Sequence, residues 1–196
     1  MTSLCLLAQK YYVDKCPAIY HHYTPKYHKL LKDKKVTVFL EIGIGNHELM
    51  APIVGDHYIH GASLRMWRDY FPQAEIIGCD ILEEVLFQED RIRTYKVDQS
   101  SSVSLINMMN NIDKKCDVIL DDGSHQQEHQ ILSFKTLWQY VADGGFYIIE
   151  DIHKENLEEM SELSHIFEDC KLRHIHEHNL DQQGFIVFVK REDLSQ

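Results

Sequence analysis

Acidic side chains follow five short apolar runs of this sequence, and a histidine stands close to one of them. The runs lead into Glu41, Asp80, Asp98, Asp122 and Asp151, and His125 comes three residues after Asp122. Carboxylates bind divalent cations and accept hydrogen bonds from hydroxyls, while an imidazole exchanges protons near neutral pH. The pattern indicates a site that binds a cation or polar ligand and transfers a proton.

Three of the acids, Asp122, Glu150 and Asp151, favour a metal site. Their two segments, DDGSH and IIEDIH, contain no lysine or arginine. Carboxylates brought close together would repel one another and take up protons unless a positive charge lay between them. An all-oxygen ligand set favours Mg²⁺ over zinc, with Mn²⁺ and Ca²⁺ as alternatives.

The acids that follow the first three predicted strands indicate an adenosine site. An acid after the second strand, here Asp80, typically accepts hydrogen bonds from the ribose hydroxyls, and Asp98 after the third can accept from the adenine amino group. The segment Glu41-Ile-Gly-Ile-Gly45 adds a glycine turn that lets a ligand approach the backbone. This turn alone is weak support, because Asn46 follows it where a dinucleotide fingerprint would continue towards a third glycine.

A strand–helix–strand unit over residues 117–153 is expected to position the metal ligands. Strands are predicted at 118–120 and 146–149, and apolar residues at helical spacing lie between them, from Ile131 to Val141, with Gly144-Gly145 as the stop. A parallel crossover places the ends of both strands on one sheet edge. Asp122 and Asp151, 29 residues apart, should therefore be neighbours.

The whole chain is predicted to be α/β. Further strands are expected at 36–40, 75–80, 92–97, 171–177 and 185–191, with a polar hairpin turn at 179–184, and helices at 100–112, at 155–167 and after Ser63, which is expected to cap its helix. These elements predict a Rossmann-like, seven-stranded, mostly parallel sheet with an antiparallel last strand and helices on both faces. Residues 1–196 should form a single domain, with 1–35 as a helical cap and 36–191 as the core.

Two segments outside the strands are candidates for ligand contact. Residues 46–61 form a connection longer than is usual between a strand and a helix, which is typical of a lid or binding loop, or of an exposed insertion. Residues 1–35 are rich in aromatic residues and either pack as short amphipathic helices or fold over the site. Lys15, His22 and Tyr23 are the substrate-binding candidates there.

Composition narrows the classes of partner. The 31 acidic and 20 basic residues give a formal charge of −11, which disfavours nucleic acid and suits a cation or a neutral substrate. Five scattered cysteines without a CxxC pair indicate reduced thiols rather than a zinc knuckle. No signal peptide or membrane-spanning run is recognised, so a cytoplasmic protein without membrane contact is expected.

Several motifs resemble the class I S-adenosylmethionine-dependent methyltransferases, and among them the metal-dependent sugar O-methyltransferases of the macrocin and mycinamicin type. The likeness covers roughly residues 8–190 and is carried by LEIGIG, SLRMW, YFPQAEIIGCDI, DQSS, DDGSH, HQILSFKTLW and GGFYIIEDIH. A counterpart of the additional N-terminal domain of the macrolide enzymes is not expected in this sequence, so the resemblance leaves the substrate and the oligomeric state, including a homo-oligomer, open.

The resemblance implies roles for individual residues. It implies that S-adenosylmethionine is bound by Glu41, Gly43, Gly45, Asp80, Asp98 and Gln99, and Ser63 and Asp121 are further candidates for that site. It also implies that Asp122, Glu150 and Asp151 serve the metal and that His125 is the catalytic base, acting with Asp122.

The function expected from these features is Mg²⁺-dependent O-methylation of a hydroxyl on a sugar or glycoside, a nucleotide-sugar being one such acceptor. A catechol-type or other small-molecule O-methyltransferase is the nearest alternative. A zinc peptidase is a more distant one, because His125-Gln-Gln-Glu-His129 matches the pattern HxxEH. A module that binds S-adenosylmethionine without catalysis is the third.

Overall fold

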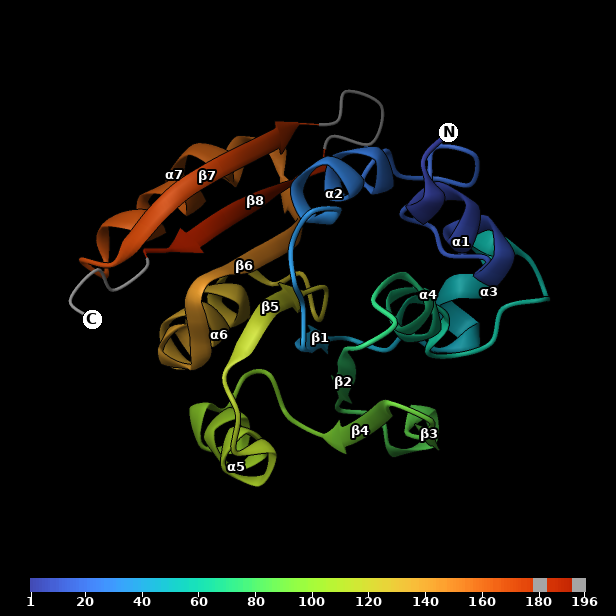
Figure 1. The fold of residues 1–196 in the computed structure, drawn as a ribbon, viewed down its shortest axis with the longest axis horizontal. Coiled ribbons are helices and arrows are strands. Elements are labelled where there is room, and N and C mark those ends of the chain that lie inside the picture. The colour runs from blue at the N-terminus through green and yellow to red at the C-terminus, as the bar shows by residue number, and fades with distance from the viewer. Residues whose placement is uncertain (178–182, 192–196) are drawn as a thin grey trace.

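The computed structural model describes residues 1–177 and 183–191, and its centre is a single twisted β-sheet (Figure 1). The strand order is β3-β4-β2-β1-β5-β6-β8-β7. The strands are β1 (Val38–Ile42), β2 (Glu75–Asp80), β3 (Gln88–Glu89), β4 (Ile92–Lys96), β5 (Cys116–Asp121), β6 (Val141–His153), β7 (Cys170–Glu177) and β8 (Gln183–Lys190). The five from β4 to β6 pair in parallel, whereas β8 runs antiparallel to both β6 and β7.

Helices cover both faces of the sheet (Figure 1). The α-helices are α1 (Ser3–Tyr11), α2 (Thr24–Leu31), α3 (His47–Val54), α4 (Ala62–Tyr70), α5 (Ser102–Ile112), α6 (Gln127–Leu137) and α7 (Leu157–Ser161). Short 3-10 helices are η1 (Glu83–Val85), η2 (Trp138–Tyr140), η3 (Lys154–Asn156) and η4 (Glu162–His165). None of the helices in the described residues is long and apolar enough to cross a membrane.

Two hydrophobic cores result, one on each face. Phe39 of β1 packs with α1, α2 and α4, while Leu40, the next residue, faces the core made with α5, α6 and α7. All five residues of β1 are buried, as expected for a central parallel strand that is covered on both sides. This explains why the strand is apolar at consecutive positions and why the buried Glu41 within it stands out.

The predicted α/β class and mostly parallel sheet are confirmed, but the strand count was wrong. The sheet has eight strands because Gln88–Glu89 adds a two-residue edge strand, paired antiparallel with β4. Such a short, polar segment has no alternating apolar pattern from which a strand could be predicted. The predicted turn at 179–184 lies mostly outside the described residues.

Three local predictions also need correction. Residues 46–61 contain helix α3, capped by Asn46, whose side chain accepts a hydrogen bond from the Leu49 amide. Helix α4 is capped by Gly61 in a left-handed conformation, so Ser63 lies inside the helix. The pair Gly144-Gly145 lies within β6, because the helix before it already ends at Leu137.

The predicted helix at 155–167 was too long. The chain instead forms 3-10 turns on either side of the five-residue helix α7.

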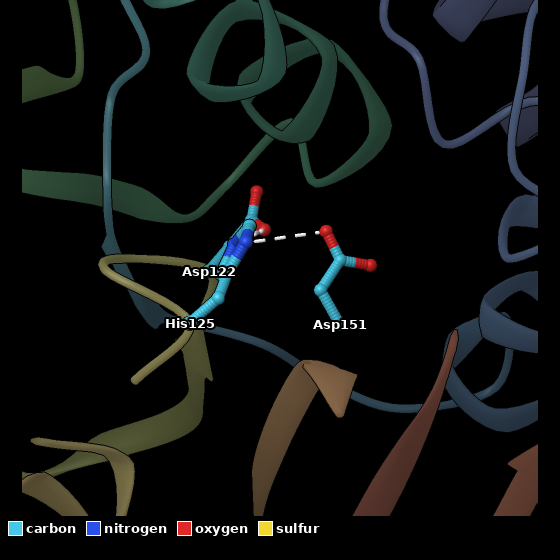
Figure 2. Close-up of side chains that lie close together, drawn as sticks. All are labelled: Asp122, His125 and Asp151. Carbon is cyan, nitrogen blue, oxygen red and sulfur yellow. Dashed lines mark hydrogen bonds and ion pairs between the residues drawn. The ribbon is translucent and has the colours of Figure 1, made fainter. Parts of the chain in front are cut away.

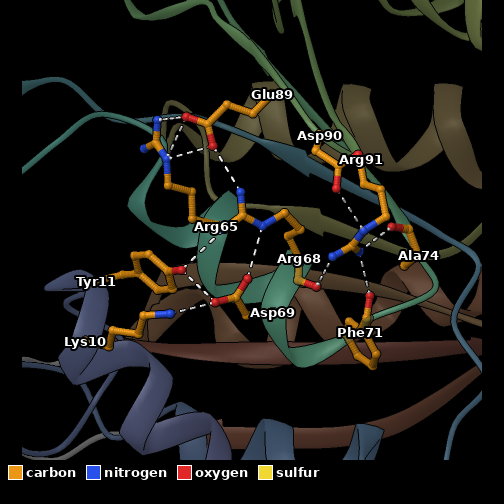
Figure 3. Close-up of polar contacts among 10 residues, drawn as sticks. All are labelled: Lys10, Tyr11, Arg65, Arg68, Asp69, Phe71, Ala74, Glu89, Asp90 and Arg91. Atoms are coloured by element: carbon orange, nitrogen blue, oxygen red, sulfur yellow. Dashed lines mark hydrogen bonds and ion pairs between the residues drawn. The ribbon is translucent and has the colours of Figure 1, made fainter.

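A polar network fastens α1 to α4 and to the edge of the sheet (Figure 3). The carboxylate of Asp69 accepts from Lys10 and Tyr11 of α1, at 2.8 and 2.6 Å, and from Arg68. Arg68 also reaches Glu89 of β3 at 3.1 Å. Although each pair is partly solvated and individually weak, together they hold the N-terminal segment in a fixed place over the sheet.

Candidate active site at the carboxyl edge of the sheet

The strand-end acids gather at one edge of the sheet, beside the switch in strand order. From β1 the chain leads outwards to β2 and β4 on one side and from β5 to β6 on the other, so the switch point lies between β1 and β5. Ligands of open α/β sheets bind at such points. Residues Ile42 and Asp121 are register partners there, which places Asp122 directly over the centre.

Asp122, His125 and Asp151 form a compact cluster at this edge (Figure 2). One ligand atom from each residue lies within 4.8 Å of the others. His125 Nε2 is 3.2 Å from Asp122 Oδ1 and 3.6 Å from Asp151 Oδ2. The structure thus brings together the two acids that the crossover predicted to be neighbours, and the histidine between them.

Local backbone geometry aims these side chains. Both His125 and Asp151 adopt left-handed φ angles, 57° and 54°, which are uncommon for residues other than glycine. The pairing of β6 with β8 shifts register between Ile149 and Ile152, so Glu150 and Asp151 lie in an irregular stretch of the strand. Such bulges re-aim side chains and concentrate at functional sites.

The charges of the cluster shift the pKa values of His125 and Asp122 in opposite directions. Burial lowers the pKa of His125, but the hydrogen bond and charge of Asp122 and the charge of Asp151 outweigh it and raise the pKa to about 9. Burial raises the pKa of Asp122, yet Lys15 and His125 hold it well below its usual range. A divalent cation bound to these acids would oppose the shift of His125, because like charge disfavours the imidazolium.

The N-terminal segment supplies donors to the same acids. Lys15, in the loop between α1 and α2, forms ion pairs with Asp122 and Glu150. Tyr23 donates to Asp151 Oδ1 at 2.7 Å, and Tyr27 donates to Glu150. Of the three substrate candidates, Lys15 and Tyr23 are therefore buried against the site, whereas His22 is exposed.

Glu150 lies apart from the compact cluster. Its side chain is buried and its two carboxylate oxygens accept from Lys15 and Tyr27. Burial and the nearby acids raise its pKa, against the lowering effect of Lys15. In the described residues the metal-competent cluster thus comprises Asp122, His125 and Asp151, with Glu150 behind them.

The first glycine loop, residues 43–45, packs against the turn that carries Asp122. Gly43 has φ +95°, and a Cβ atom there would lie 2.0 Å from the carbonyl oxygen of Asp122. Gly45 has φ +74°, and its Cβ would lie 2.6 Å from the hydroxyl of Tyr58. Glycine is required at both positions by conformation and by space.

Glu41, the buried acid of β1, has an unused acceptor. Ser63 donates to its Oε2 at 2.9 Å, whereas Oε1 is buried and forms no hydrogen bond among the described residues. Burial raises the pKa of Glu41 to about 8, although Lys15, Ser63 and the nearby Trp67 lower it. An orphaned buried acceptor at this edge suits a ligand that donates hydrogen bonds.

Asp80 and Asp98 lie on the other side of the switch point. Asp80 accepts from the amide nitrogens of Ile44 and Leu82, each at 2.9 Å, so it also holds the glycine loop. Asp98 caps its own turn by accepting from the amide and hydroxyl of Ser100. Both acids are partly exposed and can accept further hydrogen bonds.

Gln99 and Asp121, two further cofactor candidates, brace the turn that presents Asp122. The Gln99 amide donates to Asp121 Oδ1 at 2.7 Å, and its oxygen accepts from the Ser124 amide at 2.9 Å. Asp121 is fully buried, and burial raises its pKa to about 7. Their contacts support the site from beneath its surface.

The histidines of the HxxEH segment do not share a helical face. His125 precedes α6 with a left-handed φ, and only His129 lies within the helix. His129 contacts the Ser124 hydroxyl at 2.9 Å, while His125 turns to Asp122. The geometry therefore lacks the paired imidazoles that a zinc peptidase needs.

Two tyrosines of the site were not identified from the sequence. Tyr27 was among many aromatic residues and had no distinguishing spacing. Tyr58, in the predicted loop, is buried and donates to the Ile44 carbonyl oxygen at 3.1 Å. Neither has a local sequence signal, because its position depends on packing between segments far apart in the chain.

Comparisons with known proteins agree with the methyltransferase resemblance, although no family model matches the chain. A tetracenomycin-C rhamnosyl 3'-O-methyltransferase of Streptomyces olivaceus is 38% identical over 149 residues, covering 74% of this chain and 36% of that protein. The mycinamicin VI 2''-O-methyltransferase of Micromonospora griseorubida is 36% identical over 153 residues, covering 76% of this chain and 36% of that protein. The chain thus spans about a third of the length of these relatives.

A solved structure agrees over the whole chain. The MycE methyltransferase of the mycinamycin biosynthetic pathway, in complex with Mg, SAH and mycinamycin VI, superposes with a TM-score of 0.74 and 26% identity. The match covers 100% of this chain and 56% of that one.

Together, the sheet order, the site and these matches define a class I S-adenosylmethionine-dependent methyltransferase fold. Within that class the homologues of the chain are sugar O-methyltransferases of the mycinamicin, tetracenomycin and macrocin type, which confirms the resemblance found in the sequence.

Proposed function

We propose that this chain catalyses the S-adenosylmethionine- and Mg²⁺-dependent O-methylation of a hydroxyl on a sugar or glycoside. The observation that carries the proposal is the cluster of Asp122, His125 and Asp151 beside a glycine loop at the switch point. The printed activities of the homologues and the Mg and SAH of the MycE complex support it.

The residues present fit both groups that the proposal requires, a divalent cation and S-adenosylmethionine. The carboxylates of Asp122 and Asp151, with Glu150 behind them, are suitable ligands for a hard divalent cation, with Mn²⁺ or Ca²⁺ as alternatives, and they leave the His125 imidazole as the base. On the other side, the loop of Gly43 and Gly45 and the Oε1 atom of Glu41, which has no hydrogen bond among the described residues, are the proposed contacts for S-adenosylmethionine. Asp80 and Asp98 are the proposed acceptors for its ribose and adenine.

The proposed chemistry is a methyl transfer to an oxygen nucleophile. S-adenosylmethionine supplies the methyl electrophile, and Mg²⁺ supplies the charge that makes a sugar hydroxyl more acidic. Asp122 and Asp151 orient His125, whose Nε2 atom is the site's proton acceptor when the imidazole is neutral.

Transfer of labelled methyl groups tests the proposal. Nucleotide-sugars, glycosides, catechols and nucleic acids would be incubated with the protein, with Mg²⁺ or with chelator. We expect label in a sugar hydroxyl only with the metal. Label in catechols alone would favour the small-molecule alternative, label in nucleic acid would contradict the argument from charge, and binding without transfer to any acceptor would favour a non-catalytic module.

Asp80→Ala is expected to weaken the binding of S-adenosylhomocysteine by about tenfold or more, which corresponds to ~1.5–3 kcal/mol for a lost charged acceptor. The loss has two sources, because Asp80 is the proposed ribose ligand and also holds the Ile44 amide at 2.9 Å. Isothermal titration calorimetry measures it. Glu83→Gln, which removes an exposed acid at the same edge, is the matched control and should bind normally. Equal affinity in Asp80→Ala and wild type would refute the assignment.

The variant His129→Ala distinguishes the proposed Mg²⁺ site from a zinc site at the HxxEH segment. Among the described residues the His129 side chain contacts the Ser124 hydroxyl and none of the proposed metal ligands, so the variant should keep its Mg²⁺ requirement and its rate within about threefold. His125→Ala should lose turnover and still bind cofactor. Elemental analysis completes the test, since tightly bound zinc that disappears in His129→Ala would establish the HxxEH reading instead.

A further inference from the structure

Two cysteines of the N-terminal segment, Cys5 and Cys16, lie side by side where α1 packs against the loop before α2. Both are buried free thiols, and both line a cavity of about 320 Å³. Cys16 Sγ lies 3.7 Å from the carbonyl oxygen of Cys5, and the two thiols are close enough to form a hydrogen bond. The fold therefore brings together two thiols that are 11 positions apart in sequence.

The sulfur of Cys5 is surrounded by hydrogen-bond donors. The Thr2 hydroxyl donates to it at 3.1 Å, and the Thr24 hydroxyl lies 3.2 Å from it. Cys5 is also the third residue of α1, where the helix dipole favours a negative charge. Burial raises the pKa of this thiol, but hydrogen bonds from both threonines and from Cys16 outweigh it and lower the pKa below its usual value. Because a neutral thiol is a weak acceptor, these donors suit a thiolate better.

The other three cysteines have a different environment. Cys79, Cys116 and Cys170 are also free and buried. Burial raises the pKa of all three thiols, to about 12 for Cys116 and Cys170. Buried thiols with a raised pKa are unreactive, so Cys5 is the nucleophile that the five cysteines offer.

The cavity provides space for a small reactant beside both sulfur atoms. Its lining consists of Cys5 and Cys16 together with Met1, Thr2, Pro17, Ala18 and Pro25. None of these side chains carries a formal charge when the thiols are protonated, so the cavity suits a neutral molecule better than an ion. Its volume is sufficient for a disulfide that joins two small thiols.

We propose that Cys5 and Cys16 form a redox-active dithiol, a modification site that reacts with small neutral disulfides of the form RSSR. The Cys5 thiolate, having given its proton to water, attacks one sulfur of RSSR, so that a mixed disulfide forms and RS⁻ leaves. Cys16 gives its proton to this RS⁻ and attacks the Cys5 sulfur. The bond between Cys5 and Cys16 forms, and the second RS⁻ leaves and takes up a proton from water. Two protein thiols are thereby oxidised to a disulfide, and one RSSR is reduced to two RSH.

The modification acts on the segment that contacts the catalytic acids. Cys16 directly follows Lys15, one of the donors to those acids. The Lys15 carbonyl oxygen accepts from the amides of Tyr23 and Thr24, at 3.1 and 2.9 Å. A disulfide between Cys5 and Cys16 therefore ties α1 to the segment that carries these donors, whichever acceptor the protein methylates.

Incubation of the folded wild-type protein with an excess of the disulfide of 2-mercaptoethanol tests the proposal. The remaining thiols are then alkylated, and the tryptic peptides are analysed by mass spectrometry. We expect peptides 1–10 and 16–26 joined by a disulfide, with the other three cysteines alkylated. Dithiothreitol should reverse the link. This experiment needs no variant, so it does not depend on the folding of one.

Single variants separate the roles of the two thiols. Cys16→Ser should stop at the mixed disulfide on Cys5, because the second thiol is absent. Cys5→Ser should slow the modification of Cys16 by about tenfold or more, because the attacking thiolate is gone. Thr24→Val keeps the size of the side chain but removes a donor, and it should slow the reaction of Cys5 by about threefold or more. Cys170→Ser removes a thiol outside the pair and should match wild type.

Three results would overturn the inference. If neither thiol reacts in the folded protein although both react in urea, the cavity does not admit the disulfide. If wild type stops at a mixed disulfide, or links other cysteines equally well, the pair is not a dithiol site. If Cys16 reacts as fast in Cys5→Ser as in wild type, or Cys5 as fast in Thr24→Val, Cys5 is not the activated thiol. None of these results bears on the binding of S-adenosylmethionine or Mg²⁺, so they are distinct from a failure of the proposed function.

Discussion

Asp122→Asn is expected to abolish Mg²⁺-dependent methyl transfer, lowering the rate by a hundredfold or more. Loss of groups that merely support a metal ligand already costs about 10–100-fold, and Asp122 is a proposed ligand itself. The same carboxylate pairs with Lys15 and lies 3.2 Å from His125, so its charge also orients both cationic groups. Transfer of labelled methyl groups across a range of Mg²⁺ concentrations measures the effect.

Two controls make that result specific. S-adenosylhomocysteine should still bind to Asp122→Asn in a calorimetric titration, because the proposed ribose and adenine ligands are unchanged. Asp90→Asn removes the same charge from a side chain that is 91% exposed at the far edge of the sheet, and it should behave as wild type. Undiminished, Mg²⁺-dependent activity in Asp122→Asn would exclude this acid as a metal ligand.

Gly43→Ala should have the largest effect on stability and cofactor binding among single substitutions of the glycine loop. Its Cβ atom would lie 2.0 Å from the Asp122 carbonyl oxygen, and neither atom can move without displacing backbone. The added strain of a left-handed φ and a backbone collision should cost about 3 kcal/mol or more. Thermal unfolding and calorimetric titration with S-adenosylhomocysteine would record both losses.

Gly55→Ala is the matched control for that prediction. Gly55 has a similar φ of +90°, but its Cβ would meet nothing within 4 Å. The control isolates conformational strain, because Gly55 has φ 90° and ψ 172°, a backbone region that costs a residue other than glycine about 1–3 kcal/mol. If Gly43→Ala is no more destabilising than Gly55→Ala, the contact between the first glycine loop and the Asp122 turn is not essential.

The crossover logic explains how much of the fold could be predicted. Consecutive apolar residues marked the parallel strands, and the acids after them marked one sheet edge, so the neighbouring positions of Asp122 and Asp151 followed from topology alone. The strand Gln88–Glu89 could not be predicted, because two polar residues have no periodicity. Helix α3 was missed because the connection that contains it was taken for a loop, although Asn46 is a typical N-cap residue.

A different cause explains why part of the site could not be predicted from the sequence. Lys15 and Tyr27 are separated from Glu150 by more than 100 residues, and no local pattern records which acid a distant donor will meet. Positive φ angles such as those of His125 and Asp151 are also uncommon outside glycine, so the sequence does not predict them. Both features depend on packing between distant segments, and the spacing of residues does not record that packing.

The N-terminal donors also determine when the site can form during folding. Lys15 pairs with Glu150 across 135 positions of sequence, and Tyr23 with Asp151 across 128. Contacts between residues so far apart in sequence must overcome a large loop-closure entropy, so they form only after most of the chain is in place, and they slow folding. During synthesis, the donor segment emerges long before the acids that it neutralises. The catalytic edge is therefore expected to be among the last parts of the domain to acquire native order and among the first to lose it on local unfolding.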